Sequence, residues 1–139
     1  MLARNSYSQE FIAHCRTRIG SDVQAYRKLA AASGQSSASA LEAIEPVYFN
    51  NLLLAMDAFF THRTRTLEKK DGNPLNEVRV LCRSIVENDA VLMKDSTINL
   101  NPAKSVLGLA VGDSIRLSLE EFVRISDAYF AEMLVKFAE

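Results

Sequence analysis

A chain of 139 residues with a formal net charge of −1 has room for one hydrophobic core, and it has no overall attraction to nucleic acid or to an acidic membrane surface. Its two cysteines, Cys15 and Cys82, fall on expected core faces, so we interpret them as small buried hydrophobic residues rather than as a disulfide. No stretch approaches the roughly 20 apolar residues of a membrane span, and the first residues lack the apolar centre of a signal peptide. We therefore expect a cytoplasmic protein with no membrane partner.

The first predicted helix covers residues 7–33. Ser6 and Gln9 have the spacing of a capping box before it, and Gly34 is a typical stop residue after it. Asp22 falls inside the apolar stripe of this helix, which is unusual for a carboxylate. The stripe recurs at helical spacing and consists of Phe11, Ile12, Cys15, Ile19, Tyr26, Leu29 and Ala30.

The second predicted helix covers residues 46–70, beginning at Pro46 and ending before Asp71 and Gly72. Its first half is apolar on nearly all sides, which is typical of a helix that is central in its own fold or covered by another subunit. We therefore expect a homodimer that forms through this helix. One face carries Phe49, Leu52, Leu53, Met56, Phe60 and Leu67, with Arg63 among them.

The rest of the chain predicts two more helices, separated by a segment in which the helical spacing of apolar residues is lost. Asn73 and Pro74 predict the start of a third helix over residues 74–89. Polar and apolar residues then alternate over 97–100 and 114–117, which predicts a short β-hairpin within 96–118. Ser118 followed by Glu121 forms a capping box for a last helix over 118–138. The predicted fold is a mainly α, single-domain antiparallel four-helix bundle, with the hairpin inserted between helices three and four.

Arg63 is the polar residue whose expected position is hardest to reconcile with a core, because an unpaired buried guanidinium is very costly. Asp22 and Asp89 occupy comparable positions on the first and third helices, and we expect them as its partners. Three interpretations remain open: a structural ion pair, an anion or carboxylate pocket with Arg63 at its base, and a side chain that reaches out to solvent.

The opposite side of the second helix carries small and basic residues. These are Asn51, Ala55, Ala58, His62, Arg65 and Lys69. The two alanines would allow another helix to approach closely. We expect a second copy of the chain to bind this face. As a weaker alternative, the face and Arg83 together would bind an acidic protein or a nucleic acid. His62 could act as an acid or base, but no nucleophile is spaced to pair with it.

Motifs for metals, cofactors and catalysis are absent from the sequence. Its two histidines, His14 and His62, are too few and too far apart for a metal site, and the cysteines have no CxxC partner. The glycines at 108 and 112 fit neither a Walker loop nor a dinucleotide fingerprint. We therefore expect no metal, no cofactor and no catalytic residues. The predicted function is a non-catalytic homodimeric interaction or regulatory module; the alternative is a small enzyme or ligand-binding bundle with a pocket at Arg63, Asp22 and Asp89.

Overall fold

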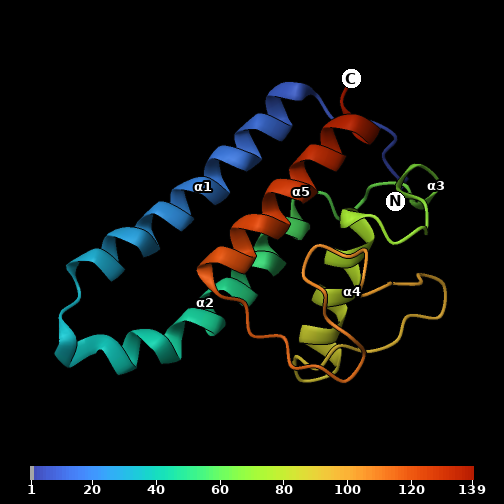
Figure 1. Cartoon of the computed structure of the whole chain (residues 1–139). Coiled ribbons are helices and arrows are strands. Elements are labelled where there is room, and N and C mark those ends of the chain that lie inside the picture. Colours follow the sequence, from blue (N-terminus) through green and yellow to red (C-terminus); the bar gives the residue numbers. More distant parts are fainter. Residues whose placement is uncertain (1) are drawn as a thin grey trace.

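The computed structural model describes residues 2–139, and helices form most of this part of the chain (Figure 1). Four of them are long: α1 (Gln9–Ala32), α2 (Ala38–Ala58), α4 (Pro74–Glu87) and α5 (Leu119–Phe137). A short helix, α3 (Arg65–Glu68), lies between α2 and α4, and a 3₁₀ turn (Gln35–Ser37) precedes α2. The prediction of a mainly α protein is confirmed.

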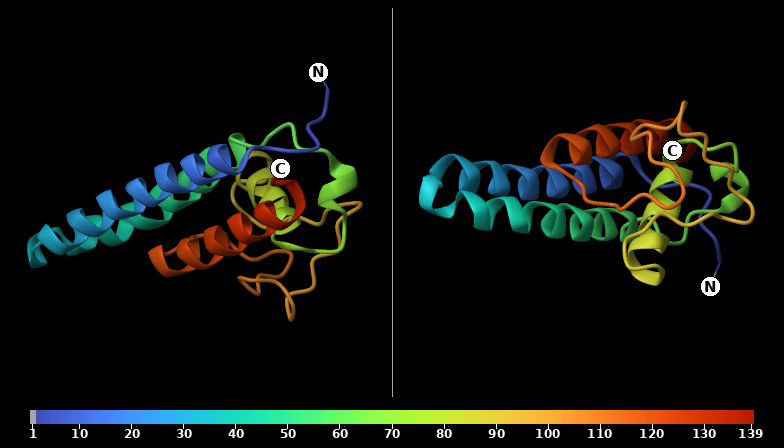
Figure 2. Two further views of the ribbon diagram at one scale, coloured as in Figure 1. Left: turned by 90° about the horizontal axis from the view of Figure 1, so that it is seen from above. Right: turned by 60° about the horizontal axis from the view of Figure 1, so that its bottom comes forward.

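The long helices pack around one hydrophobic core. Helices α1 and α2 form an antiparallel pair, α5 packs against both of them, and α4 packs against α2 and α5. The far ends of α1 and α2, with the connection at 33–37, project beyond the rest of the molecule as an arm (Figure 2). The largest side chains that the core excludes fully from solvent are Tyr129, Phe49, Phe60, Phe122, Phe130 and Phe137.

Local capping chemistry positions the helix starts. Ser118 and Glu121 form the predicted capping box of α5, and Asn73 accepts hydrogen bonds from two amides of the first turn of α4, which begins at Pro74. The cap of α1 is Ser8, whose Oγ accepts from the amide of Phe11, rather than the predicted Ser6. These caps explain why the starts of α4 and α5 could be predicted so closely.

The predicted second helix, 46–70, is wrong at both ends. The small residues after the 3₁₀ turn extend α2 back to Ala38, so Pro46 lies inside the helix instead of starting it. At the other end α2 stops at Ala58, because the following chain turns to pair with the N-terminal segment: the amide of Arg4 donates to the carbonyl of His62 at 2.7 Å, and the amide of Thr64 donates to the carbonyl of Arg4 at 2.8 Å.

The predicted β-hairpin is also wrong, because residues 2–139 contain no β-strand and the region has a single isolated bridge, between Val91 and Ser114. Side chains of the helices replace the missing partner strand. The Asn50 side chain of α2 donates to the carbonyl of Ile115 at 2.8 Å and accepts from the amide of Leu117 at 3.1 Å. Alternation in this region therefore reflects extended chain lying on the helices, with Ile115 and Leu117 buried beneath it.

A second anchor holds the same long segment, residues 88–118, against α4. The buried carboxylate of Glu77 accepts hydrogen bonds from the amides of Val106 and Leu107 at 2.8 and 3.0 Å. The segment wraps around α4 (Figure 1). The chain ends are also tied together, since the amide of Tyr7 donates to the carbonyl of Phe137 and the amide of Glu139 donates to the carbonyl of Tyr7.

Candidate functional site

Arg63 lies at the centre of a buried ion cluster next to the end of α2. Its side chain is fully excluded from solvent, as expected for a residue on the apolar face. Nε donates to Oε1 of Glu68 at 2.8 Å, and one terminal nitrogen donates to Oδ1 of Asp57 at 2.8 Å and to the carbonyl of Phe60 at 3.1 Å. The hydroxyl of Tyr129 donates to the same Asp57 oxygen at 2.9 Å. Every charged contact of Arg63 is thus internal.

Glu68, the last residue of α3, is the second buried charge of the cluster. Besides Arg63, it accepts two hydrogen bonds from Arg79 of α4, at 2.6 and 3.0 Å, and one from Asn76 at 2.8 Å. The Glu68 side chain has no exposed area, whereas that of Arg79 is 25% exposed. Two arginines and two carboxylates therefore compensate one another, and a buried group of this kind is stable only when its members are fully hydrogen-bonded.

The electrostatics of the cluster keep Arg63 and Glu68 charged. Burial alone would raise the pKa of Glu68, but the hydrogen bonds from Arg79 and the charge of Arg63 hold it below its ordinary value. Burial would likewise lower the pKa of Arg63, and Tyr129, Asp57 and Glu68 raise it instead. Burial and the nearby Asp57 carboxylate raise the pKa of Tyr129 well above its ordinary value. The hydrogen bonds of this cluster fix the position of α3 relative to α2 and α4.

The expected partners of Arg63 lie elsewhere. Asp22 is exposed on α1, where its carbonyl accepts from the hydroxyl of Tyr48, and Asp89 is exposed just after α4 with a positive φ of 53°. Each of the two lines a different hollow, and neither hollow includes Arg63. The partners of Arg63 differ from the predicted ones because α2 ends at Ala58, and the turn after it folds Arg63 back between Asp57 and Glu68.

The outer face of α2, by contrast, is uncovered along its length. Asn51, Ala55 and Ala58 are exposed on the helix, and His62, Arg65 and Lys69 are exposed beyond its end. Ile44 and Val47 are exposed to 45% and 52% on the same helix. A shallow hollow of about 440 Å³ runs over this face between the two projecting helices, lined by Asp22, Ile44, Val47, Tyr48, Asn51, Leu52 and Ala55.

The basic residues near the end of α2 divide into two sets. Arg63 and Arg79 belong to the ion cluster, and Arg83 pairs with Glu87 at 2.7 Å and with Asp95 at 3.6 Å. Arg65, Lys69 and Lys70 form no ion pair within residues 2–139 and are exposed. Of these six arginines and lysines, only Arg65, Lys69 and Lys70 are therefore left open to an acidic or nucleic-acid partner.

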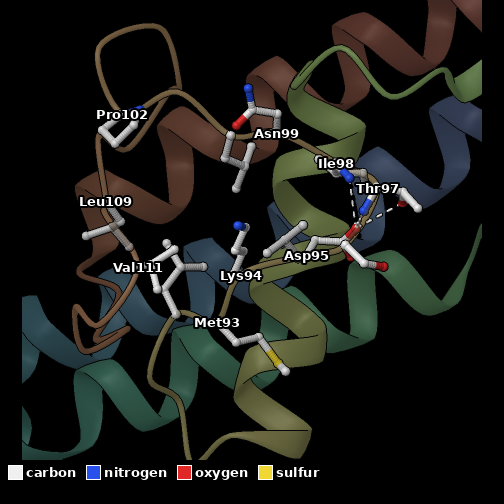
Figure 3. Close-up of a pocket in the computed structure, with 13 residues that line it drawn as sticks. Met93, Lys94, Asp95, Thr97, Ile98, Asn99, Pro102, Leu109 and Val111 are labelled. Atoms are coloured by element: carbon white, nitrogen blue, oxygen red, sulfur yellow. Dashed lines mark hydrogen bonds between the residues drawn. The ribbon is translucent and has the colours of Figure 1, made fainter.

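Another hollow, of about 440 Å³, lies under the segment that was predicted as a hairpin (Figure 3). The extended chain around Lys94–Leu100 forms one side, the chain at Leu109 and Val111 forms the other, and Val80 of α4 contributes to the lining. The carboxylate of Asp95 shapes this loop, because its Oδ1 accepts from the amides of Thr97 and Ile98, both at 2.8 Å.

Several residues that define these sites were missed from the sequence. Asp57 and Glu68 lie only six and five residues from Arg63, at separations that a continuous helix would place on different sides. No sequence spacing distinguishes Asn50 or Glu77 from the other polar residues of their helices. The only available signal was the high density of Asn and charged residues around the Asp71–Asn73 turn, which here supplies Asn76 and Arg79 to the cluster.

Comparison of the chain with protein-family models, with curated proteins and with solved structures finds no match. None of the helices within residues 2–139 is long and apolar enough to cross a membrane. In that same part of the chain, no group of three or more His, Cys, Asp or Glu side chains has an arrangement that could hold a metal ion. The proposals that follow therefore depend on the geometry of this molecule alone.

Proposed function

We propose that the protein is a non-catalytic interaction module that forms a homodimer through the outer face of α2. The observation that carries the proposal is a row of apolar, small and polar residues along this helix, which is exposed at every position except Tyr48, a residue half-buried against Tyr26 of α1. Ile44, Tyr48, Asn51, Ala55 and Ala58 follow one another at separations of four and three residues. This is the spacing with which two helices interlock side by side.

An antiparallel arrangement suits this row better than a parallel one. If a two-fold axis passes at Asn51, Ile44 of one copy faces Ala58 of the other, so large side chains meet small ones. The exposed Glu42 near the start of one helix then approaches the exposed Arg65 beyond the end of the other. Opposite charges at the two ends favour this orientation and oppose a parallel one.

The projecting arm also supports a role in association. The ends of α1 and α2 extend beyond α4 and α5 (Figure 2). Along these two helices Leu29, Ile44 and Val47 are exposed to 54%, 45% and 52%. An apolar side chain left in solvent on a long helical arm gains stability when a partner covers it. A cytoplasmic location belongs to the same proposal, because Cys15 and Cys82 are both free thiols.

The test is the mass in solution, measured by light scattering coupled to size exclusion over a wide range of protein concentration. The chain has a mass of 15.4 kDa, and we expect a species of about twice that mass. Ala55→Arg places a bulky charge in the middle of the exposed row and should give a monomer. Ala131→Arg makes the same change at an exposed position of α5 and should leave the dimer intact.

Two results would overturn the proposal. The first is a wild-type protein that stays at its monomer mass at the highest concentration. The second is an equal loss of the dimer in the Ala55→Arg and Ala131→Arg variants, which would place the interface elsewhere. Circular dichroism of both variants shows whether each keeps the helical fold of the wild type.

A further inference from the structure

The hollow under the Lys94–Val111 segment has the size and lining of a small-molecule site. Its volume of about 440 Å³ falls within the range of roughly 300–1,000 Å³ that is typical of such sites. The apolar part of its lining comes from Val80, Leu92, Ile98, Leu100, Leu109 and Val111. These side chains come from α4 and from both sides of the loop, so they enclose an apolar ligand from several directions.

One cation, the solvent-exposed Lys94, lies beside this apolar lining. The side chain of Lys94 points into the space between Asn99, Leu109 and Val111 (Figure 3). Within residues 2–139, Lys94 forms neither an ion pair nor a side-chain hydrogen bond. An ammonium group beside apolar walls, with no carboxylate to neutralise it, attracts an anion more strongly than it would in open solvent.

The neighbouring carboxylate does not compete for this lysine. Asp95 lines the same hollow, but its Oδ1 is occupied by the amides of Thr97 and Ile98 and by the Thr97 hydroxyl, and its Oδ2 faces Arg83 at 3.6 Å. The side chain of Asp95 is only 10% exposed. Its charge is therefore compensated by its own loop and by α4.

We propose that this hollow binds a small amphipathic carboxylate, with an aliphatic chain between the apolar walls and its carboxylate on the ammonium of Lys94. The apolar walls favour the chain by removing it from water, and Lys94 favours an anionic head over a neutral one. The site shares no residue with the outer face of α2. It therefore goes beyond self-association, and the failure of either proposal leaves the other standing.

The experiment is a calorimetric titration with butanoate, hexanoate and octanoate, and with 1-octanol as the neutral probe. We expect the affinity to rise by up to about fourfold for each added methylene until the hollow is filled. Octanoate should bind at least about tenfold more tightly than 1-octanol, as expected for a hydrogen bond to a charged group. Amide shifts in nuclear magnetic resonance spectra should concentrate at Leu109, Val111 and the 94–100 segment.

Matched variants test whether the carboxylate of the ligand binds to the ammonium group of Lys94. Lys94→Ala should lower the octanoate affinity by about tenfold or more, while Lys94→Arg should retain most of it. Lys104→Ala is the control, because Lys104 is exposed on the same segment and does not line the hollow. Val111→Glu, at a residue that is 64% exposed, should weaken octanoate more than 1-octanol without disturbing the core, because both lose an apolar contact and only octanoate meets a like charge.

The proposal fails if none of the three acids binds or if 1-octanol binds as tightly as octanoate. It also fails if Lys94→Ala and Lys104→Ala weaken octanoate equally, since the effect would then be one of net charge. Amide shifts confined to the α1–α2 arm would assign the binding to a different surface and would equally overturn it.

Discussion

Arg63 and Glu68 form an ion pair in which neither side chain has any exposed surface, with Nε and Oε1 2.8 Å apart. They lie five residues apart in the sequence, on either side of the turn that leads into α3. The pair is surrounded by Asp57, Arg79, Asn76 and Tyr129, and no buried side-chain polar atom of the described residues is left without a partner. The connection between α2 and α4 is therefore held by charge rather than by regular secondary structure.

Removal of the Glu68 charge should be strongly destabilising. Glu68→Gln leaves Arg63 with Asp57 as its one carboxylate and leaves Arg79 with none, and breaking a buried pair in this way costs about 3–5 kcal/mol. Urea denaturation measures the change in the free energy of unfolding. Glu120→Gln, at an exposed position in the first turn of α5, is the control and should change it by less than about 1 kcal/mol. Equal effects of the two changes would contradict the structural role of the cluster.

Stability should fall in acid. Glu68 has a folded-state pKa below its ordinary value of 4.5, so above that pH both folded and unfolded chains carry the charge and the stabilisation is complete. As the pH falls below 4.5, the unfolded chain takes up the proton first, and the free energy of unfolding decreases until the folded-state pKa is passed. Asp95 and Asp71, whose pKa values are also lowered, add to the same trend.

The acid dependence is measured by urea denaturation between about pH 7 and about pH 3. The Glu68→Gln variant should show a flatter dependence than the wild type, because one of the groups with a lowered pKa is missing. Parallel curves for the two proteins would show that Glu68 does not contribute to the acid transition.

Asn50 should stabilise the long segment that replaces the predicted hairpin. Asn50→Ala removes its hydrogen bonds to the carbonyl of Ile115 and the amide of Leu117, and we expect a loss of about 1–3 kcal/mol because these backbone groups are left unpaired. Hydrogen exchange of the Leu117 amide should also become faster. Asn5→Ala, at an exposed position near the N-terminus, should leave both quantities unchanged.

Two glycines should respond to alanine in opposite directions. Gly20 lies within α1 and a Cβ built there meets no atom within 4 Å, so Gly20→Ala should raise stability by about 0.5–1 kcal/mol. Gly72 has a φ of 87°, and a Cβ there would lie 3.0 Å from the carbonyl oxygen of Asn99, so Gly72→Ala should lower stability by more than about 1 kcal/mol. Thermal unfolding of both variants shows whether each substitution raises or lowers the stability of the fold. A stabilising effect of Gly72→Ala would contradict the geometry of this turn.

The parts of the fold that were predicted correctly depend on short-range chemistry. Asn73 with Pro74, and Ser118 with Glu121, define helix starts through contacts within four residues, and sequence spacing reveals such contacts. The apolar stripe of α1 was visible for the same reason at Ile12, Cys15, Ile19 and Tyr26, although its members Phe11 and Leu29 are exposed. The burial of Arg63 could be anticipated because it shares a face with Met56 and Phe60, which are both buried.

The errors all involve partners distant in sequence. The backbone of Arg4 forms hydrogen bonds with His62 and Thr64, about sixty residues away, at the point where the predicted second helix is interrupted. No local sequence pattern predicts this contact. The alternation that predicted two paired strands was real, but Asn50 of α2 binds the backbone of the 114–117 segment where a neighbouring strand would have done so. Glu77 of α4 holds Val106 and Leu107, in the connection between the two alternating segments. Period-two alternation indicates extended chain with one buried side, and it does not identify what lies beside it.

The pairing of Tyr7 with Ala138 has a consequence for folding during synthesis. Tyr7 is 4% exposed, it contacts Phe60 and Phe137 through its ring, and its backbone is bonded on both sides to residues 137 and 139. The segment that leads into α1 therefore cannot reach its native place until those late residues have left the ribosome. We expect nascent chains to stay sensitive to protease near Tyr7 until translation has passed Glu139, because their last stabilising contact joins opposite ends of the sequence.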